Sequence, residues 1–337
     1  MASQVVLNLS PEQQLHLLTG TGILARRVHV DPATGVATPL ERSCARCLLS
    51  DDLPGVSLHP SGLCNHCLQY EQQVLSGAYS ETRALELIHA LRGSGTPDCV
   101  LAYSGGKDSA AALLVARQRY GLHPVAVLVD NGFIPDQVKE AAREFCESLD
   151  TRLIIRPIEI ARQTAESLRT GSNVVPCQFC IRNVFAVMAQ VCREHGLRLV
   201  LGGHRFPPLS FRLDQSTHRP EDADICCVSP LLSLRIPERE QIRLISAAGW
   251  KPVSIAGNTS NCRLIGYIEE HFFDRHGYNP HVYEVSKEIR AGFYSRADGL
   301  AKIERPHLAP DHRLEVETKL GWTGPGANGI PAPHQGA

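Results

Sequence analysis

The sequence contains no long apolar run. No stretch of apolar residues approaches the roughly 20 that a membrane-spanning helix requires, so we expect no membrane span. The first residues, MASQVVLNLSPEQQ, also lack the basic segment followed by an apolar one that marks a secretory signal peptide. From these two absences we expect a cytoplasmic protein with no membrane partner.

The chain also lacks an excess of charge of either sign. Its 34 Lys and Arg residues balance 35 Asp and Glu residues, which leaves a formal net charge of −1. The global basic field that usually marks a phosphate-backbone binder is therefore missing, and the composition gives no support for a large nucleic-acid partner. The apolar share of 43% in 337 residues is enough for one sizeable α/β domain with small modules attached.

Cysteine, in contrast, is abundant, with 12 residues. Such a number would suit the disulfide framework of a small secreted domain, but this chain is large and shows no export signal. Three separate C-x-x-C pairs are present, and such pairs are typical of metal sites. We therefore expect metal chemistry rather than disulfide bonds.

From residue 98 onward, short apolar runs alternate with helical patterns of about 12 residues. The expected strands lie in CVLAYS, PVAVLVD, RLIIRPI, LRLVLGG and ICCVSPLL, with KPVSI as a later one. Strands that alternate with helices in this way indicate an α/β protein, in which a parallel sheet carries helices on both faces.

Composition and periodicity divide the chain into six parts. The parts are residues 1–40 (N-terminal extension), 41–75 (a turn-rich zinc ribbon), 76–97 (helical linker), 98–270 (nucleotide domain), 271–321 (helical C-terminal segment) and 322–337 (disordered tail). Within the extension we expect an amphipathic stretch from Pro11 to Leu18 and a strand within Ala25 to Val30. Ser80 fits the N-cap of the linker helix.

The most specific signal is the hexapeptide Ser104-Gly105-Gly106-Lys107-Asp108-Ser109, which stands between the apolar strand VLAY and a helix. Strand, glycine turn and helix N-terminus gather backbone N–H groups around one point, where the helix dipole favours an anion. The two glycines allow the close approach that a pyrophosphate requires. Lys107 would neutralise phosphate charge, Asp108 would hold Mg²⁺ or orient a hydroxyl, and the two serines would donate to phosphate oxygens.

This hexapeptide resembles the SGGxDS loop of the PP-loop (ATP pyrophosphatase) superfamily, over roughly residues 98 to 270. The resemblance implies an adenine nucleotide alpha hydrolase-like domain that binds ATP with Mg²⁺ and cleaves it between the α and β phosphates. It implies that the product AMP is first attached to an oxygen of the acceptor, so that a nucleophile can displace it.

Two further segments of the nucleotide domain enter this comparison. In the superfamily the second strand ends near the adenine, which implies that Asp130 contacts adenosine; a turn-opening aspartate is the alternative. The segment Leu201-Gly202-Gly203-His204-Arg205 resembles the G-H-x-x-D-D segment of PP-loop thiolases, and implies nucleotide contact by Gly203 and a catalytic His204. Because Phe206-Pro207-Pro208 stands where the acidic pair would be, closing the nucleotide site is the other role for His204.

Four cysteines have the spacing of a structural zinc site. Cys44 and Cys47 are followed, after sixteen residues, by Cys64 and Cys67. Each pair would form a knuckle, and two knuckles complete a tetrahedral S₄ site for Zn²⁺, with an iron–sulfur cluster as the competing occupant. His66 could replace one ligand, although a solvated histidine is the simpler expectation.

The same region resembles the N-terminal ribbon of N-acetyl sugar amidotransferases, which also place a PP-loop after the ribbon. The likeness covers about thirty residues there and returns in the segment from Glu288 to Ala297. It implies a small-molecule acceptor in preference to tRNA.

A second cysteine group consists of Cys177 and Cys180, which open a helix, and the distant Cys262. Three cysteines without a fourth would suit a [4Fe-4S] cluster with one open iron. The arrangement resembles the cluster-dependent tRNA thiolases, in which the resemblance implies that the open iron holds sulfide. A redox or persulfide pair and inert core thiols are the alternatives. We expect Cys99, Cys146 and Cys192 to be core residues.

Together these signals predict ATP-dependent adenylation of an acceptor oxygen followed by [4Fe-4S]-dependent sulfur transfer to a small molecule or a nucleobase. The expected partners are ATP, a small-molecule acceptor and a sulfur donor. Whether the chain forms a homodimer is left open. The first alternative is an N-acetyl sugar amidotransferase that takes ammonia from a partner glutaminase subunit. A non-catalytic zinc-ribbon adaptor ranks last because it leaves the hexapeptide unexplained.

Overall fold

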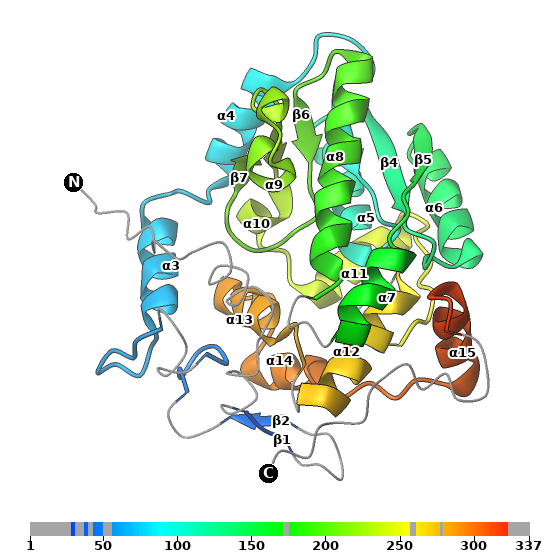
Figure 1. Cartoon of the computed structure of the whole chain (residues 1–337). Helices are drawn as coiled ribbons and strands as arrows, with labels where there is room; N and C mark the ends of the chain where they lie inside the picture. The colour runs from blue at the N-terminus through cyan, green and yellow to red at the C-terminus, as the bar shows by residue number, and fades with distance from the viewer. Residues whose placement is uncertain are drawn as a thin grey trace.

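A six-stranded sheet forms the centre of the protein in the computed structural model (Figure 1). The structure describes residues 28–30, 37–39, 43–49, 56–170, 175–256, 261–276 and 279–322. The strands of the sheet are β3 (Cys99–Ala102), β4 (Pro124–Asp130), β5 (Leu153–Pro157), β6 (Leu199–Leu201), β7 (Ser210–Arg212) and β8 (Cys226–Val228).

The strand order is β5-β4-β3-β6-β8-β7, and neighbouring strands from β5 to β8 run parallel. The expected parallel α/β sheet is therefore confirmed in its main part. The edge strand β7 was not predicted and runs antiparallel to β8, because a short connection from β6 turns the chain back along that edge. Three partly exposed residues are too few to give a strand pattern.

Alternation along the strands separates two apolar layers. Leu101 of β3 points to one face with Ala126, whereas its neighbour Val100 points to the other with Val125. The helices associated with the first face are α4 (Glu81–Leu91), α5 (Lys107–Leu114), α6 (Asp136–Ser148), α10 (Pro230–Leu234) and α11 (Glu238–Ala247). The long helix α8 (Cys177–His195) covers the second face.

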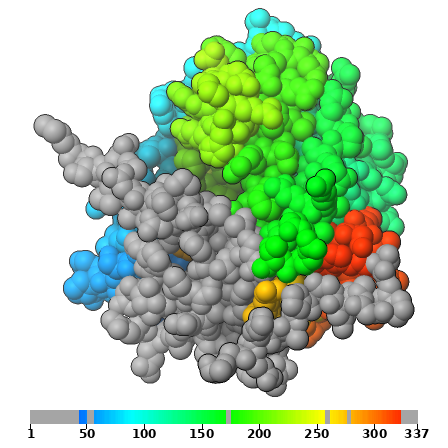
Figure 2. Space-filling model, in the orientation of Figure 1, coloured from blue at the N-terminus to red at the C-terminus, as the bar shows by residue number. Residues whose placement is uncertain are grey.

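The remaining described elements are shorter or lie outside the sheet. They are β1 (Val28–Val30), β2 (Ala37–Pro39), α3 (Asn65–Leu75), the π-helical turn η1 (Val115–Arg119), α7 (Ala161–Thr170), α9 (Asp214–Thr217), the 3-10 turn η2 (Pro220–Asp222), α12 (Arg263–His276), α13 (Val282–Ala291), α14 (Arg296–Lys302) and α15 (Pro310–Lys319). Figure 1 shows α13 and α14 between the sheet domain and the N-terminal elements. In Figure 2, α15 lies at the surface beside the sheet domain.

Several expectations about local structure are settled. The linker helix α4 is confirmed, because the Ser80 side chain accepts a hydrogen bond from Arg83 N. β1 pairs antiparallel with β2, which confirms a strand at residues 28–30. The second knuckle continues directly into α3, so the ribbon is less turn-rich than expected. The prediction for KPVSI is wrong: Pro252 has no N–H for a ladder, and Val253 and Ile255 pack on the first apolar layer without pairing.

Other expectations fall on residues that the structure does not describe. The stretch from Pro11 to Leu18 and residues 323–337 of the expected tail lie outside the described residues. Among the described helices, none combines the length and apolar character needed to cross a bilayer.

Candidate functional site

The hexapeptide forms the turn between β3 and α5. Gly105 has a φ of +80°, and a Cβ at this position would lie 2.8 Å from Cγ1 of Val138 on α6. Both the positive φ and the close approach of Val138 require glycine at this position. Gly106 is the N-cap residue of α5, so the helix N-terminus opens directly at Lys107 and Asp108. This geometry suits the binding of an anionic phosphate group.

Side chains from distant segments hold the loop in place. The indole Nε1 of Trp250 donates to the carbonyl of Gly105 at 3.1 Å, and Asn261 Nδ2 donates to the carbonyl of Ser104 at 3.1 Å. Within the loop, the buried Ser109 hydroxyl donates to the carbonyl of Gly106 and lies 3.1 Å from Ser104 Oγ. Ser109 therefore supports the turn itself in this structure.

Each of the two charged residues of the loop has a partner on α11. Lys107 Nζ lies 3.0 Å from an Asp108 oxygen and 3.4 Å from Oε2 of Glu238. Gln241 Nε2 donates to Asp108 Oδ1 at 2.7 Å. Since all of these side chains keep partial solvent access except Gln241, the charges line the mouth of the loop rather than its core.

Arg205 is the centre of the largest ionic network of the site. It lies 3.2 Å from Asp108, 3.1 Å from Glu288 and 3.4 Å from Glu238, and only 1% of its side chain is exposed. Its guanidinium also donates to Tyr294 Oη at 2.5 Å and stacks on the Phe293 and Tyr294 rings. Burial opposes its charge, but the neighbouring carboxylates raise the pKa of Arg205 above its ordinary value.

Gly203 brings the loop after β6 against the phosphate loop. A Cβ at Gly203 would lie 2.8 Å from the backbone nitrogen of Ser109, so only glycine permits this approach. His204 follows, and its Nε2 lies 3.2 Å from the carbonyl of Pro208. Burial, assisted by Lys287, lowers the pKa of His204 to about 4, so this imidazole is neutral at pH 7. Its expected catalytic role stays a prediction.

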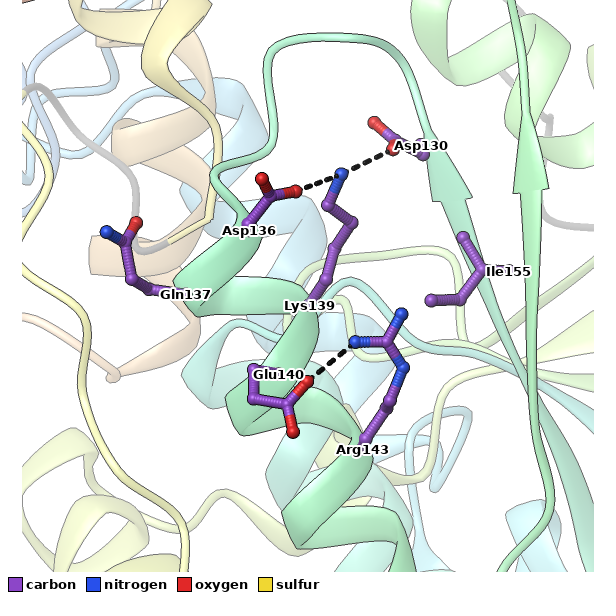
Figure 3. Close-up of a pocket in the computed structure, with 7 residues that line it drawn as sticks. All are labelled: Asp130, Asp136, Gln137, Lys139, Glu140, Arg143 and Ile155. Carbon is purple, nitrogen blue, oxygen red and sulfur yellow. Dashed lines mark hydrogen bonds and ion pairs between the residues drawn. The ribbon is translucent and has the colours of Figure 1, made fainter.

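Asp130 ends β4 and lies in a hollow of about 550 Å³ between α6 and β5 (Figure 3). Its Oδ1 accepts the N–H of Gly132, as a turn-opening aspartate does, and its Oδ2 pairs with Lys139 at 2.9 Å. Figure 3 shows Lys139 reaching between Asp130 and Asp136. Asp130 therefore opens a turn in this structure, and its contact with adenosine stays a prediction.

The four ribbon cysteines form one buried group. Their sulfur atoms lie within 4.8 Å of one another, and the distances from Cys44 to Cys67 and from Cys47 to Cys64 are both 3.7 Å. Tetrahedral Zn–S bonds of about 2.3 Å place sulfurs about 3.8 Å apart, so the spacing fits a metal ion of this kind. Cys64 N lies 3.2 Å from Cys44 Sγ, as a backbone donor to a thiolate does. The group could hold a metal, and zinc is our expectation for it.

The ribbon shares its core with α13. Val282, Val285 and Ile289 pack against Leu48 and the cysteines. Arg290 is buried on the same helix, and although burial opposes its charge, the sulfurs of Cys47, Cys67 and Cys64 raise its pKa. A fixed cation beside four thiolates offsets part of their charge. His66 is half-buried against the Tyr283 ring and is neither solvated nor part of the sulfur group.

The second cysteine group converges on one asparagine. Asn131 Nδ2 lies 3.4 Å from Cys180 Sγ and 3.5 Å from Cys262 Sγ, and Cys177 belongs to the same apolar cluster. The three sulfurs do not lie within the sphere of a single ion. Three cysteines that each bind a different iron need no such closeness; their thiols are the donor type that an iron–sulfur cluster takes, and the cluster itself stays a prediction. Burial raises the pKa of Cys180 to about 12 and that of Cys262 to about 11.

Cys262 stands directly before α12 (Arg263–His276). No strand precedes it among the described residues; instead Arg263 N, at the start of α12, donates to the carbonyl of Phe133 at 3.1 Å. Cys262 nevertheless lies at the carboxyl edge of the sheet, since its neighbour Asn261 contacts the phosphate loop. Arg263 itself pairs with Glu315.

Sequence reasoning missed most residues that support the two sites. Asn131 follows Asp130 directly and Asn261 precedes Cys262, so adjacency to predicted site residues was the available signal. Glu238, Gln241 and Glu288 gave no signal of their own, because their partners lie far away in the sequence. Cys99, Cys146 and Cys192 are buried, as expected. Cys227 is buried too, whereas Cys226 is half-buried.

No family model matches the chain. Over 235 residues it is 25% identical to an uncharacterized protein of Methanocaldococcus jannaschii, a match that covers 69% of this chain and 82% of that protein. Over 165 residues it is 29% identical to one of the subunits of the glutamine-hydrolyzing GMP synthase of Methanopyrus kandleri, covering 47% and 52%. Over 67 residues it is 42% identical to the tRNA(Ile)-lysidine synthase of Nitratidesulfovibrio vulgaris, covering 18% and 19%.

A solved structure, described as a predicted subunit of tRNA methyltransferase from Methanocaldococcus jannaschii, is 19% identical, with a TM-score of 0.35. The alignment covers 55% of this chain and 91% of that one. Among the sequence matches, the chain spans about half of the GMP synthase subunit and about a fifth of the lysidine synthase. These two matches support the PP-loop ATP pyrophosphatase superfamily and an enzyme with ATP-dependent, adenylation-type chemistry.

Proposed function

We propose that the protein adenylates an oxygen atom of a small-molecule acceptor and then replaces that oxygen with sulfur. The observation that carries the sulfur step is the convergence of Cys180 and Cys262 on Asn131 at the carboxyl edge of the sheet. Asn261 ties this group to Ser104 of the phosphate loop. In α/β sheets this edge is where ligands bind.

In the first step, the acceptor oxygen forms a bond to the α-phosphorus of ATP, and the bond between the α and β phosphates breaks. The N-terminus of α5 and Lys107 bind the departing pyrophosphate, whose negative charge increases as it leaves. Asp108 and Glu238 offer carboxylate oxygens at the mouth of the loop, which is the donor type that Mg²⁺ prefers. When ATP binds, its phosphate oxygens would replace these carboxylates as the ion-pair partners of Lys107.

In the second step, a sulfur nucleophile bonds to the adenylated carbon, and AMP leaves with the former acceptor oxygen. Cys177, Cys180 and Cys262 would hold a [4Fe-4S] cluster, which would supply an open iron for an exogenous sulfide. Apolar side chains pack beside these cysteines, together with Asn131 and the pair His281 and Glu269, and would limit the access of bulk water to the activated carbon. Holding both reactants at one edge makes the displacement efficient.

The decisive experiment is anaerobic purification of the full chain, followed by iron and sulfide analysis and absorbance spectroscopy. We expect about four irons per chain, which is the composition of the proposed cluster, and loss of the signal in Cys180→Ser and Cys262→Ser. Cys226→Ser is the matched control, because this half-buried thiol lies outside the group and should leave the iron content unchanged. An iron-free wild type whose Cys262→Ala variant keeps full ATP turnover with ammonia would overturn the sulfur step.

A second candidate is amide formation with ammonia. Two observations favour it: the match to a glutamine-hydrolyzing GMP synthase subunit and the ribbon resemblance to N-acetyl sugar amidotransferases. In this reaction ammonia, supplied by a glutaminase partner, takes the place of sulfide. AMP formation that depends on free ammonium and an N-acetyl amino sugar, with no dependence on iron, would select this candidate.

A further inference from the structure

Helix α13 carries a lysine that no described carboxylate neutralises. Lys287 Nζ lies 5.0 Å from the centre of the Phe206 ring and 5.6 Å from that of Tyr283. None of the carboxylates in the described parts of the chain forms an ion pair with it; Glu284, one turn earlier, acts only from a distance. Aromatic faces stabilise an ammonium without cancelling its charge, so Lys287 keeps its attraction for an anion.

Two nitrogen-bearing side chains lie near this lysine. Arg290 lies one turn further along α13, and His204 lies beside Phe206, where the charge of Lys287 contributes to lowering its pKa. Burial, together with Arg290, lowers the pKa of Lys287, while the side chain keeps partial solvent access. Lys287 and Arg290 repel each other on this helix, and an anion bound beside Lys287 would offset that repulsion.

Lys287 lies near the phosphate loop. Glu288, the residue after Lys287, pairs with Arg205, and Arg205 pairs with Asp108 of the loop. Separately, His204 follows Gly203, which touches the backbone of Ser109. Two separate chain segments therefore lead from the loop to Lys287. ATP bound at the loop would have Lys287 near it.

We propose that Lys287 binds an anionic group of the acceptor, a carboxylate or a phosphate, with Phe206 and Tyr283 as the walls of that subsite. This inference rests on the proposed adenylation function and adds the charge class of the acceptor to it. A charged anchor away from the reacting oxygen fixes the acceptor beside the α-phosphate, which is how binding energy at a remote group serves catalysis.

The test uses the full chain saturated with Mg²⁺ and α,β-methylene-ATP, so that the loop is occupied by an analogue that resists cleavage. Inorganic phosphate and acetate are titrated separately by calorimetry, which distinguishes the two sources of the anion. We expect the wild type to bind one of them and Lys287→Met to lose at least tenfold in affinity. Lys287→Arg should keep most of the binding, and Lys251→Met, at an exposed lysine that pairs with Glu144, should change nothing.

Three outcomes would overturn the proposal. They are a wild type that binds neither anion, a Lys287→Met variant that binds as the wild type does, and anion binding that disappears when the analogue fills the loop. Unchanged analogue affinity in Lys287→Met shows that the variant is folded. Release of AMP and pyrophosphate is measured separately, so a failure of the adenylation proposal is distinguishable from a failure of the anion subsite.

Discussion

Lys107 carries the charge that the phosphate loop presents to its ligand. Its ammonium is partly exposed and pairs with the carboxylates of Asp108 and Glu238 at the mouth of the loop, so it contributes little to core packing. We expect Lys107→Ala to lower AMP formation on the order of 10²–10³-fold, as the loss of one transition-state donor does. The free energy of unfolding should change by less than about 1 kcal/mol.

The measurement is chromatographic product analysis with the exposed-lysine variant Lys251→Ala as the control. AMP and pyrophosphate are the expected products of the wild type. ADP and inorganic phosphate as the main products would contradict the assignment of the loop, whatever the variant does.

Arg205 neutralises carboxylates from three separate parts of the chain. Removing a buried partner of this kind leaves charges without compensation, at a cost of about 3–5 kcal/mol. We therefore expect Arg205→Met to lower the free energy of unfolding by about that amount, measured by urea denaturation. Arg152→Met, at an exposed arginine, should stay within about 0.5 kcal/mol of the wild type. Equal unfolding curves for the two variants would show that the network adds nothing to stability.

The titration of His204 makes the free energy of unfolding depend on pH. The unfolded chain titrates this histidine near pH 6.5, whereas burial lowers the pKa in the folded chain to about 4. Between these values the unfolded chain binds more protons, so stability falls as the pH falls through this window and is unaffected above it. Because the side chain keeps some solvent access, we expect a loss of about 1 kcal/mol between pH 7 and pH 5.

Urea unfolding at the two pH values checks this expectation. His204→Gln should remove this part of the pH dependence, since glutamine can still donate to the carbonyl of Pro208 and does not titrate. His89→Gln, at an exposed histidine of α4, is the control. An unaltered difference between pH 7 and pH 5 in His204→Gln would assign the dependence to other groups.

At the scale of elements, α13 joins the ribbon to the phosphate loop. One face packs on the ribbon through Val282, Val285 and Ile289, and another carries Glu288 toward Arg205. We expect one zinc per chain, a lower melting temperature after chelation, and a raised KM for ATP, because the helix loses the support of its ribbon side. Metal analysis, calorimetry and ATP kinetics on the full chain measure the three effects.

The full chain is needed because residues 41–75 alone would lack the α13 side of their core. Cys64→Ser should reproduce the effects of chelation and lower the recovered yield, while Cys226→Ser should do neither. A chain that holds no zinc, or that melts at the same temperature with and without chelator, would contradict a structural zinc site.

The sequence and the structure agree best where function depends on neighbouring residues. The turn at Gly105 and the S₄ spacing from Cys44 to Cys67 are local patterns, so both could be predicted. The strand predicted for KPVSI was wrong because an apolar run alone does not reveal whether the edge of a sheet is free for pairing. The burial of Arg205 could not be predicted, because it depends on Asp108 and Glu288, which only the fold brings together.

At the scale of the whole molecule, the described parts form one sheet domain, and α13 packs against both the ribbon and α14. The candidate ATP site and the second cysteine group draw on residues from 104 to 294, and the ribbon core draws on residues from 44 to 303. Pattern reasoning could name the phosphate loop and the cysteines, yet the residues that support them are brought together by long-range packing that no window of sequence contains.

The contact between the ribbon and α13 has a consequence for biosynthesis. Leu48 N donates to Ser286 Oγ, a partner 238 residues later in the chain. Translation proceeds from the N-terminus, so the ribbon leaves the ribosome well before its partner helix exists. Until then, Leu48, Leu49 and Val56 have no α13 to cover them, and only a metal bound by the four cysteines would organise the knuckles. Polypeptides that stop short of residue 282 would carry that apolar surface permanently, which makes them natural substrates for chaperones and proteases.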